Sequence, residues 1–241
     1  MIQSASIRIV EETGSTNADL AAAVRTGQAR EADWLIAHRQ NAGRGRQGRQ
    51  WFDGSGNFMG STVVALDTGD PPPTTLSFVT ALAVSDAVGD VLPSGVTADL
   101  KWPNDVLIDG GKLSGILLEM VGSAVVVVGI GVNLARAPDL TDRKTASLAQ
   151  FVPAPTLDDF AQVLIDAFAH RLSEWREDGL AAIMQRFLAR SIHTQGAVIS
   201  VHDTDGSRIQ GTFAGLEETH GALRLRLADG SERVIRAGDI Q

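Results

Sequence analysis

The chain has 241 residues, of which 44% are hydrophobic, enough for one large domain or for one domain with a small appendage. It contains no cysteine, which excludes disulfides, thiolate catalysis and cysteine-based zinc sites and fits a reducing cytoplasm. A net charge of -8 disfavours binding to nucleic acid or acidic membranes, and neither a signal-peptide pattern nor a run of about 18 apolar residues predicts secretion or membrane insertion.

The first part of the sequence predicts strands, one helix and one charged loop. Residues 6–10 and 34–37 have strand patterns, and residues 18–24 form a good helix sequence with Ser15 or Thr16 as its N-cap. Residues 57–66 predict the strand that follows the charged loop. Three prolines then precede residues 74–91, which predict a largely buried helix.

The second part predicts a hairpin, a buried strand and two helices. The Asp109-Gly110 pair lies between two apolar runs, which predicts a tight turn with Lys112 at the start of the returning strand. Residues 124–128 predict a strand buried on both faces, which continues into the segment GIGVN. Residues 156–176 and 180–189 predict helices, the first with Thr156 as its N-cap.

From residue 197 the pattern changes to short alternating runs separated by Asp-Gly turns. Such a pattern predicts a small β-barrel. We therefore expect an α+β domain over residues 1–191 and a small barrel domain over residues 192–241. No spacing among the five histidines suggests a metal site, and the metal ligands are left unassigned.

The charged loop contains the letters of a dinucleotide-binding fingerprint, GRGRQG at residues 43–48. That fingerprint requires a helix directly after the glycines, whereas Trp51-Phe52 and a Gly/Ser/Asn turn follow here, so we reject this interpretation. Residues 34–52 contain no acid and four arginines, Arg39, Arg44, Arg46 and Arg49. Such a loop suits a compact polyanion such as a nucleoside triphosphate; a solvated surface loop is the alternative.

Three segments together resemble the catalytic domain of biotin protein ligases. They are GRGRQGRQW at 43–51, KWPND at 101–105 with KLSGILLE at 112–119, and GIGVN at 129–133. The resemblance covers nearly the whole chain. It implies a mixed β-sheet flanked by helices, similar to class II synthetases, and a C-terminal SH3-like barrel. The chain is similar to the short form of the family, which lacks an N-terminal DNA-binding domain.

The resemblance also implies an activity. Such an enzyme forms biotinyl-5'-adenylate and pyrophosphate from biotin and ATP with Mg²⁺, and then transfers biotin to a lysine of a biotin carboxyl carrier domain. We expect no DNA or membrane partner, and a monomer or a weak homodimer. The alternatives are a lipoate or octanoate ligase of the same fold, a non-catalytic biotin sensor, and a nucleic-acid-binding module.

The residues that the resemblance implies fall into three groups. The catalytic group comprises Lys112, Arg46 and Asp105. The biotin-binding group comprises Ser15, Thr16, Asn17, Gln40, Gly43, Arg44, Gly45, Arg46, Lys112 and Gly115. The nucleotide-binding group comprises Arg44, Arg46, Arg49, Trp51, Asn104, Lys112 and Asn133. Where the family often has a further basic residue, this sequence has Gln47, so the loop carries less charge.

Several of these residues have simpler interpretations. Lys112 could be a solvated lysine after a turn, Gln40 an exposed loop amide, and Asn133 the end of a strand. Asp105 could deprotonate the acceptor lysine, bind magnesium or cap the hairpin. We expect Trp102 to pack in the core, and we expect the arginine loop to be mobile until a ligand orders it.

Overall fold

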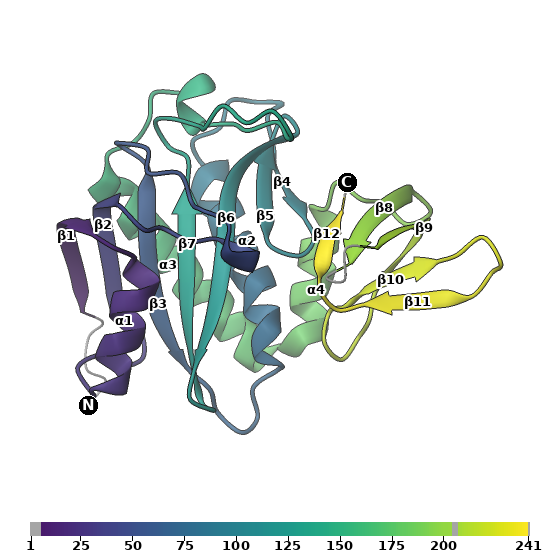
Figure 1. The fold of residues 1–241 in the computed structure, drawn as a ribbon, viewed down its shortest axis with the longest axis horizontal. Helices are drawn as coiled ribbons and strands as arrows, with labels where there is room; N and C mark the ends of the chain where they lie inside the picture. Colours follow the sequence, from purple (N-terminus) through teal and green to yellow (C-terminus); the bar gives the residue numbers. More distant parts are fainter. Residues whose placement is uncertain (1–5, 204–206, 241) are drawn as a thin grey trace.

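The computed structural model describes residues 6–203 and 207–240, and among these residues seven strands form the larger sheet (Figure 1). The strands are β1 (Ile7–Thr13), β2 (Trp34–Gln40), β3 (Phe58–Ala65), β4 (Ala98–Lys101), β5 (Asp105–Ile108), β6 (Gly111–Val121) and β7 (Val125–Val132). Their order across the sheet is β1-β2-β3-β7-β6-β5-β4. β1 and β2 run parallel and all other neighbours antiparallel, so the sheet is mixed, as predicted.

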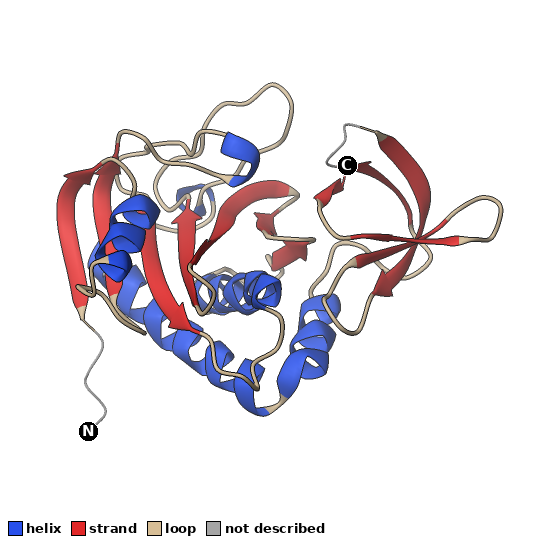
Figure 2. Ribbon diagram, turned by 60° about the horizontal axis from the view of Figure 1, so that its bottom comes forward, coloured by secondary structure: helices blue, strands red, loops and turns tan. Residues whose placement is uncertain are grey.

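Two helices cover one face of this sheet and a third packs against them (Figures 1 and 2). They are α2 (Leu76–Gly89), α3 (Leu157–Glu177) and α4 (Gly179–Ala189). α2 is buried along most of its length, which explains why its sequence is apolar all round. α3 begins at the predicted cap, where the Thr156 hydroxyl accepts a hydrogen bond from the backbone N–H of Asp159.

A single helix, α1 (Thr16–Arg25), packs on the opposite face. The Ser15 hydroxyl accepts from the N–H of Ala18, so Ser15 is the N-cap. Leu20 of α1 packs on a small second core that includes Val63 of β3 and Val127 of β7. This face is only partly covered by a helix, and beyond α1 it is left for the charged loop.

The C-terminal sheet contains, among the described residues, five antiparallel strands in the order β11-β10-β9-β8-β12. They are β8 (Val198–Asp203), β9 (Arg208–Leu216), β10 (Leu223–Arg226), β11 (Glu232–Ile235) and β12 (Gly238–Ile240). The strands agree with the predicted barrel. The Asp-Gly turn predicted at residues 205–206 lies outside the described residues, and the boundary between residues 191 and 192 stays a prediction.

Several contacts join the two sheets. α4 leads from the helical layer toward the C-terminal sheet (Figure 2), and the backbone of β4 exchanges hydrogen bonds with the segment after α4 through Leu100 and Ile192. The indole N–H of Trp102, which is buried as expected, donates to the carbonyl of Gly221 at 3.1 Å. The C-terminal sheet therefore packs beside β4 and β5.

The predicted hairpin at Asp109-Gly110 is present and connects β5 to β6. The sequence pattern does not separate β4 from β5, because the short turn at Trp102-Pro103 lies inside an otherwise continuous run. That turn pairs Lys101 with Asp105 across the two strands. None of the helices in the described part of the chain has both the length and the apolar character that a membrane crossing needs.

Candidate active site

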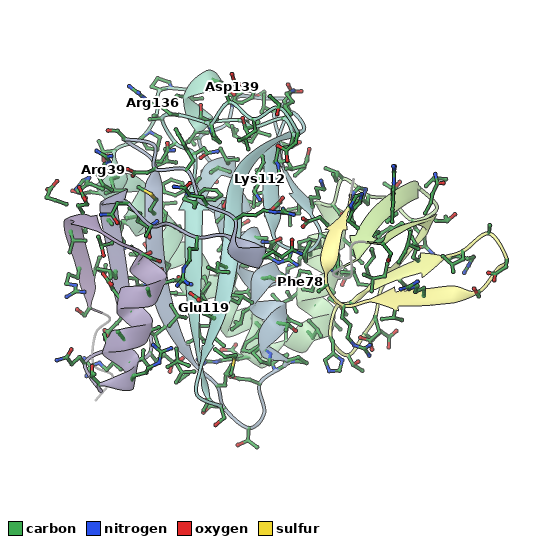
Figure 3. All side chains as sticks on the ribbon, in the orientation of Figure 1. Arg39, Phe78, Lys112, Glu119, Arg136 and Asp139 are labelled. Atoms are coloured by element: carbon green, nitrogen blue, oxygen red, sulfur yellow. The ribbon has the colours of Figure 1, made fainter. Side chains whose placement is uncertain are left out.

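One cavity of about 1110 Å³ occupies the α1 face of the large sheet and extends to the C-terminal strand β12. The charged loop, the β5–β6 hairpin and the loop after β7 form its walls. Figure 3 shows Lys112 and Glu119 toward opposite ends of β6, with Arg136 and Asp139 on the loop beyond the end of the sheet. Residues of α1, of the neighbouring strands β5, β6 and β7, and of β12 line the cavity.

Glycines of β7 provide the floor of the cavity. Alternate residues of a strand face the same side, so Gly129 and Gly131 share the face of Val127. A Cβ at Gly129 would overlap the side-chain amide of Asn17, and one at Gly131 would lie 2.5 Å from Cζ2 and Nε1 of Trp51. Any side chain at these two positions would thus fill the space that Asn17 and Trp51 now occupy.

A buried polar cluster lies above Gly129. The Oε1 of Gln40 accepts from the backbone N–H of Thr16 at 2.7 Å, and the hydroxyls of Thr16 and Ser61 are 2.7 Å apart. Asn17, which is 4% exposed, accepts from the Ser61 hydroxyl at 2.6 Å and donates to Glu119 at 2.7 Å. Gln40 lies on β2 and is buried, which excludes the exposed loop amide.

Cations border the cavity beyond this cluster, and carboxylates accompany them. Lys112 and Asp105, both about four-fifths buried, form an ion pair at 2.6 Å. Arg46 donates to the side-chain oxygen of Asn104 at 2.9 Å. Arg44, half exposed, lies 3.7 Å from Glu119. The Lys112 side chain is therefore directed into the site and is not free in solvent.

The C-terminal sheet contributes a carboxylate to the same region. Asp239 of β12 pairs with Arg49 at 2.8 Å and lies 3.7 Å from Arg46. Burial favours a higher pKa for Asp239, but the hydrogen bond from Arg49 and the charges of Arg49, Arg46 and Lys112 outweigh it, so the pKa is lowered. Asp239 is thus an anion that an anionic ligand of the arginine loop would have to displace.

Trp51 leaves the charged loop and returns to the floor. A Cβ at Gly115 would lie 2.8 Å from Cζ3 of Trp51 and 3.3 Å from Cε of Lys112, so the indole and the lysine already contact this glycine. The indole N–H is buried and has no hydrogen-bond partner among the described residues. A buried donor without a partner costs free energy, which a ligand acceptor would recover.

The two asparagine side chains proposed for the nucleotide also support other residues. The Nδ2 of Asn104 donates to the carbonyl of Ile116 at 2.8 Å while its Oδ1 accepts from Arg46. The Nδ2 of Asn133 donates to the carbonyls of Lys112 and Ala146 at 3.3 and 3.2 Å. Both amides therefore fix the positions of cationic segments, and their contact with a base stays a prediction.

The structure brings the predicted residues together with one exception. All line the cavity except Gly43, where a Cβ would instead meet Gln40 and Trp51 at 3.3 and 3.4 Å.

Residues 46–48 of the charged loop form a short 3₁₀ turn in which Gln47 has a positive φ of 58°. Gln47 is uncharged, and its side-chain oxygen accepts a hydrogen bond from Arg49 at 3.1 Å.

Sequence reasoning missed five residues at this site. They are Ser61, Lys101, Glu119, Arg143 and Asp239. Ser61 is a polar residue in a largely apolar strand, and Lys101 and Glu119 belong to two of the motifs that carry the family resemblance, so these three had a usable signal. Arg143 and Asp239 depend on contacts between distant segments. In the described part of the chain, no group of three or more carboxylate or histidine side chains is placed to hold a metal ion.

Comparison with known proteins gives the following similarities. Residues 10–133 match the biotin/lipoate A/B protein ligase family, and residues 199–241 match the biotin protein ligase C-terminal domain. The chain is 38% identical to the biotin–[acetyl-CoA-carboxylase] ligase of Paracoccus denitrificans, over 96% of this chain and 98% of that protein. It is 36% identical to the protein of the same name from Mycobacterium tuberculosis, over 96% and 87%.

Among solved structures, the chain is similar to a biotin protein ligase from Aquifex aeolicus in complex with biotin and ATP. The TM-score is 0.83 at 22% identity, over 98% of this chain and 97% of that chain. This similarity bears on the fold, and it confirms the predicted combination of a mixed sheet and a small C-terminal β domain.

Proposed function

Because the chain belongs to the biotin/lipoate A/B protein ligase family, we propose that it is an ATP-dependent biotin–protein ligase. It forms biotinyl-5'-adenylate and pyrophosphate from biotin and ATP, and then transfers biotin to a lysine of a carrier domain. The relatives named above are biotin–[acetyl-CoA-carboxylase] ligases, which supports a carboxylase carrier as the acceptor. The observation that carries the proposal is that one cavity joins a neutral polar cluster to a group of cations.

The neutral cluster suits the ureido ring of biotin. That ring needs a few fixed donors and acceptors in a site without competing water. Thr16, Asn17 and Gln40 offer hydroxyl and amide groups whose positions are fixed by buried hydrogen bonds. Glu119 orients the Asn17 amide, so the ring meets a defined arrangement of donors and acceptors.

Adenylation brings two anions together. The biotin carboxylate must approach the α-phosphate of ATP, so cations must offset the repulsion before an oxygen can attack phosphorus. Lys112 is about four-fifths buried and lies beside Gly115, and Arg46 is oriented by Asn104. We assign charge stabilisation at the α-phosphate to Lys112 and retention of the adenylate to Arg46. Loss of Arg46 is expected to let the adenylate escape.

Transfer requires a neutral amine. The acceptor lysine has an ordinary pKa near ~10.4 and must lose a proton before it attacks the adenylate carbonyl. Asp105 is the carboxylate beside Lys112, at the edge of the same cavity. We assign it to this second step, in which it accepts the proton or orients the amine while AMP leaves.

Further parts of the proposal concern the surroundings of the reaction. Mg²⁺ would arrive with the phosphates of ATP, so we assign no protein ligands to it. The absence of cysteine fits a reducing compartment, and we propose a cytoplasmic location. We further propose that the protein is a monomer or a weak homodimer, that it does not bind DNA, and that the arginine loop closes over biotin and its adenylate.

The experiment that tests the function is acid-dependent exchange of labelled pyrophosphate into ATP, with biotin and lipoate added in parallel. Exchange that depends on biotin is expected. A dithiolane has no ureido group, so lipoate could not use the fixed hydroxyl and amide groups of Thr16, Asn17 and Gln40. Exchange with lipoate alone would move the protein to the sister activity, and exchange with neither acid would refute adenylation.

A further inference from the structure

The chain contains only three lysines, Lys101, Lys112 and Lys144, and all three line the cavity. Seven lysine and arginine side chains from the described residues line it in total. Six of them have a carboxylate oxygen within 3.7 Å, namely Arg44, Arg46, Arg49, Lys112, Arg143 and Lys144. Lys101 is the exception, and the proposed reaction steps give it no role.

Lys101 lacks a partner although an acid lies opposite it. It pairs with Asp105 in the β4–β5 ladder, and such cross-strand neighbours usually interact. The Asp105 carboxylate instead points to Lys112, at 2.6 Å. In the described part of the chain, the Lys101 ammonium has no hydrogen bond and no ion pair, although its side chain is half-buried.

The charges around Lys101 leave its ammonium uncompensated. Burial lowers the pKa of Lys101; Asp105 and Asp239 oppose this, while Lys112 and Arg143 add to it, so the net direction is downward. An anion bound at this point would replace the lost hydration and offset the repulsion from two neighbouring cations. Unlike the six paired cations, Lys101 can accept an anion without first breaking an ion pair.

The sheet order indicates which anion this is. The neutral cluster lies over β3 and β7, Lys112 lies on β6, and Lys101 lies two strands further along, on β4 next to the C-terminal sheet. A ligand whose reacting carboxylate meets the α-phosphate at Lys112 would therefore extend its leaving group toward Lys101. Arg143, on the loop after β7, lies on this same side, near Asp105 and Asp239.

Resting on the proposed function, we propose that Lys101 binds the β- and γ-phosphates of ATP and the pyrophosphate that leaves. In the adenylation step a biotin carboxylate oxygen attacks the α-phosphorus, and the bond between this phosphorus and the oxygen bridging to the β-phosphorus breaks. That oxygen keeps the electron pair, so negative charge grows on the leaving pyrophosphate. The Lys101 ammonium offsets this charge, while Lys112 remains at the α-phosphate.

The test uses the full chain and inorganic pyrophosphate as the probe. Lys101→Met removes the charge and keeps the length, and Lys101→Arg keeps the charge. Lys144→Met is the matched control, because it removes a lysine from the same cavity whose ammonium is already held by Asp109 at 2.7 Å. Calorimetry gives the affinities for pyrophosphate and biotin, and the exchange assay gives the KM for ATP.

We expect Lys101→Met to weaken pyrophosphate binding and to raise the KM for ATP by about tenfold or more, as for other charged hydrogen bonds. Biotin affinity should stay unchanged, Lys101→Arg should restore most of the loss, and Lys144→Met should change the affinity by about threefold or less. The unchanged biotin affinity would also show that the variant is folded.

Three outcomes would overturn the inference. One is wild-type pyrophosphate affinity in Lys101→Met, and another is an equal loss in Lys144→Met, which would indicate a general charge effect. The third is loss of biotin binding in Lys101→Met without rescue by Lys101→Arg, which would indicate a structural role. If the wild-type protein binds pyrophosphate through Lys101 but shows no biotin-dependent exchange, the proposed function fails and the anion site stands.

Discussion

Replacing Gly129 by alanine should dismantle the polar cluster through a single methyl group. The added Cβ would lie 2.8 Å from Cγ and 3.0 Å from Nδ2 of Asn17, and would overlap its Oδ1. Asn17 belongs to α1 and its backbone cannot retreat, so its side chain must rotate away. Rotation breaks the hydrogen bonds to Ser61 and Glu119, both in a buried setting.

The magnitude follows from these two bonds. A neutral hydrogen bond contributes about 1 kcal/mol to stability and one to a charged group about 1.5–3 kcal/mol, so the total is about 2–4 kcal/mol. For a chain of this size that corresponds to a fall in Tm of roughly 5–10 °C. Because the lost groups form the proposed ureido site, biotin affinity should fall by at least about tenfold in addition.

A double-mutant cycle separates this cause from a general disturbance of β7. Asn17→Ala makes room for the new methyl group, so Gly129→Ala should have little further effect on Tm or biotin affinity in that background. Gly69→Ala is the matched control, since a Cβ there has no heavy atom within 4 Å. Calorimetry with biotin and thermal unfolding measure all five proteins, the wild type included.

Two results would refute the reasoning. If Gly129→Ala binds biotin and melts as the wild type does, Asn17 is not held over the glycine as described. If the effects of Gly129→Ala and Asn17→Ala add in the double variant, the methyl group acts elsewhere in the sheet.

Three further variants test other parts of the site and the fold. Asp105→Asn should form adenylate at a near-normal rate but transfer biotin about a hundredfold more slowly, which single-turnover assays of the two steps would measure. Asp239→Asn frees Arg49 and Arg46, so the KM for ATP should fall by about two- to fivefold, the scale of a part-exposed ion pair. Asp86→Asn, measured by urea unfolding, should cost about 2 kcal/mol at pH 7, because it removes one of the two carboxylates that pair with the buried Arg171, and Glu174 remains at 2.6 Å.

The Asp86 variant also carries a pH signature. Burial favours a higher pKa for Asp86, but hydrogen bonds from Arg171 and Arg190 outweigh it, so its pKa is lower in the folded state than in the unfolded state. Its contribution is therefore complete above the unfolded pKa near ~3.9 and is lost as the pH falls through the folded pKa. Below that range wild type and Asp86→Asn should converge; a constant difference would contradict this assignment. Normal transfer by Asp105→Asn, or a raised KM for Asp239→Asn, would contradict the other two.

Local signals predicted the parts of the site that local chemistry determines. The Asp109-Gly110 turn fixes the register that brings Lys112 to the start of β6, and both residues have the positive φ that this turn needs. The glycines at 129 and 131 lie on one face because a strand alternates. Ser15 caps α1 for reasons present within three residues.

The remaining parts depend on segments that meet only in the folded chain. Ser61 stands out as a polar residue in its strand, but its partners Thr16 and Asn17 lie far away along the chain, so the strand sequence alone does not reveal its role. Asp239 depends on how the C-terminal sheet packs beside β4, which no short pattern encodes. The isolation of Lys101 depends on the Asp105 carboxylate turning to Lys112, a choice between two neighbours that sequence spacing does not decide.

The placement of the three lysines has a consequence for the chemistry of the protein toward itself. An acyl adenylate acylates any accessible primary amine, and the lysine amines of this chain all lie at the cavity, where Lys112 and Lys144 are bound to carboxylates. The basic residues elsewhere are arginines, whose guanidinium groups do not deprotonate and are poor nucleophiles. No lysine therefore lies away from the cavity to compete with the acceptor, and, apart from the terminal α-amino group, acylation of the chain by its own adenylate is confined to three lysines that mass spectrometry can identify.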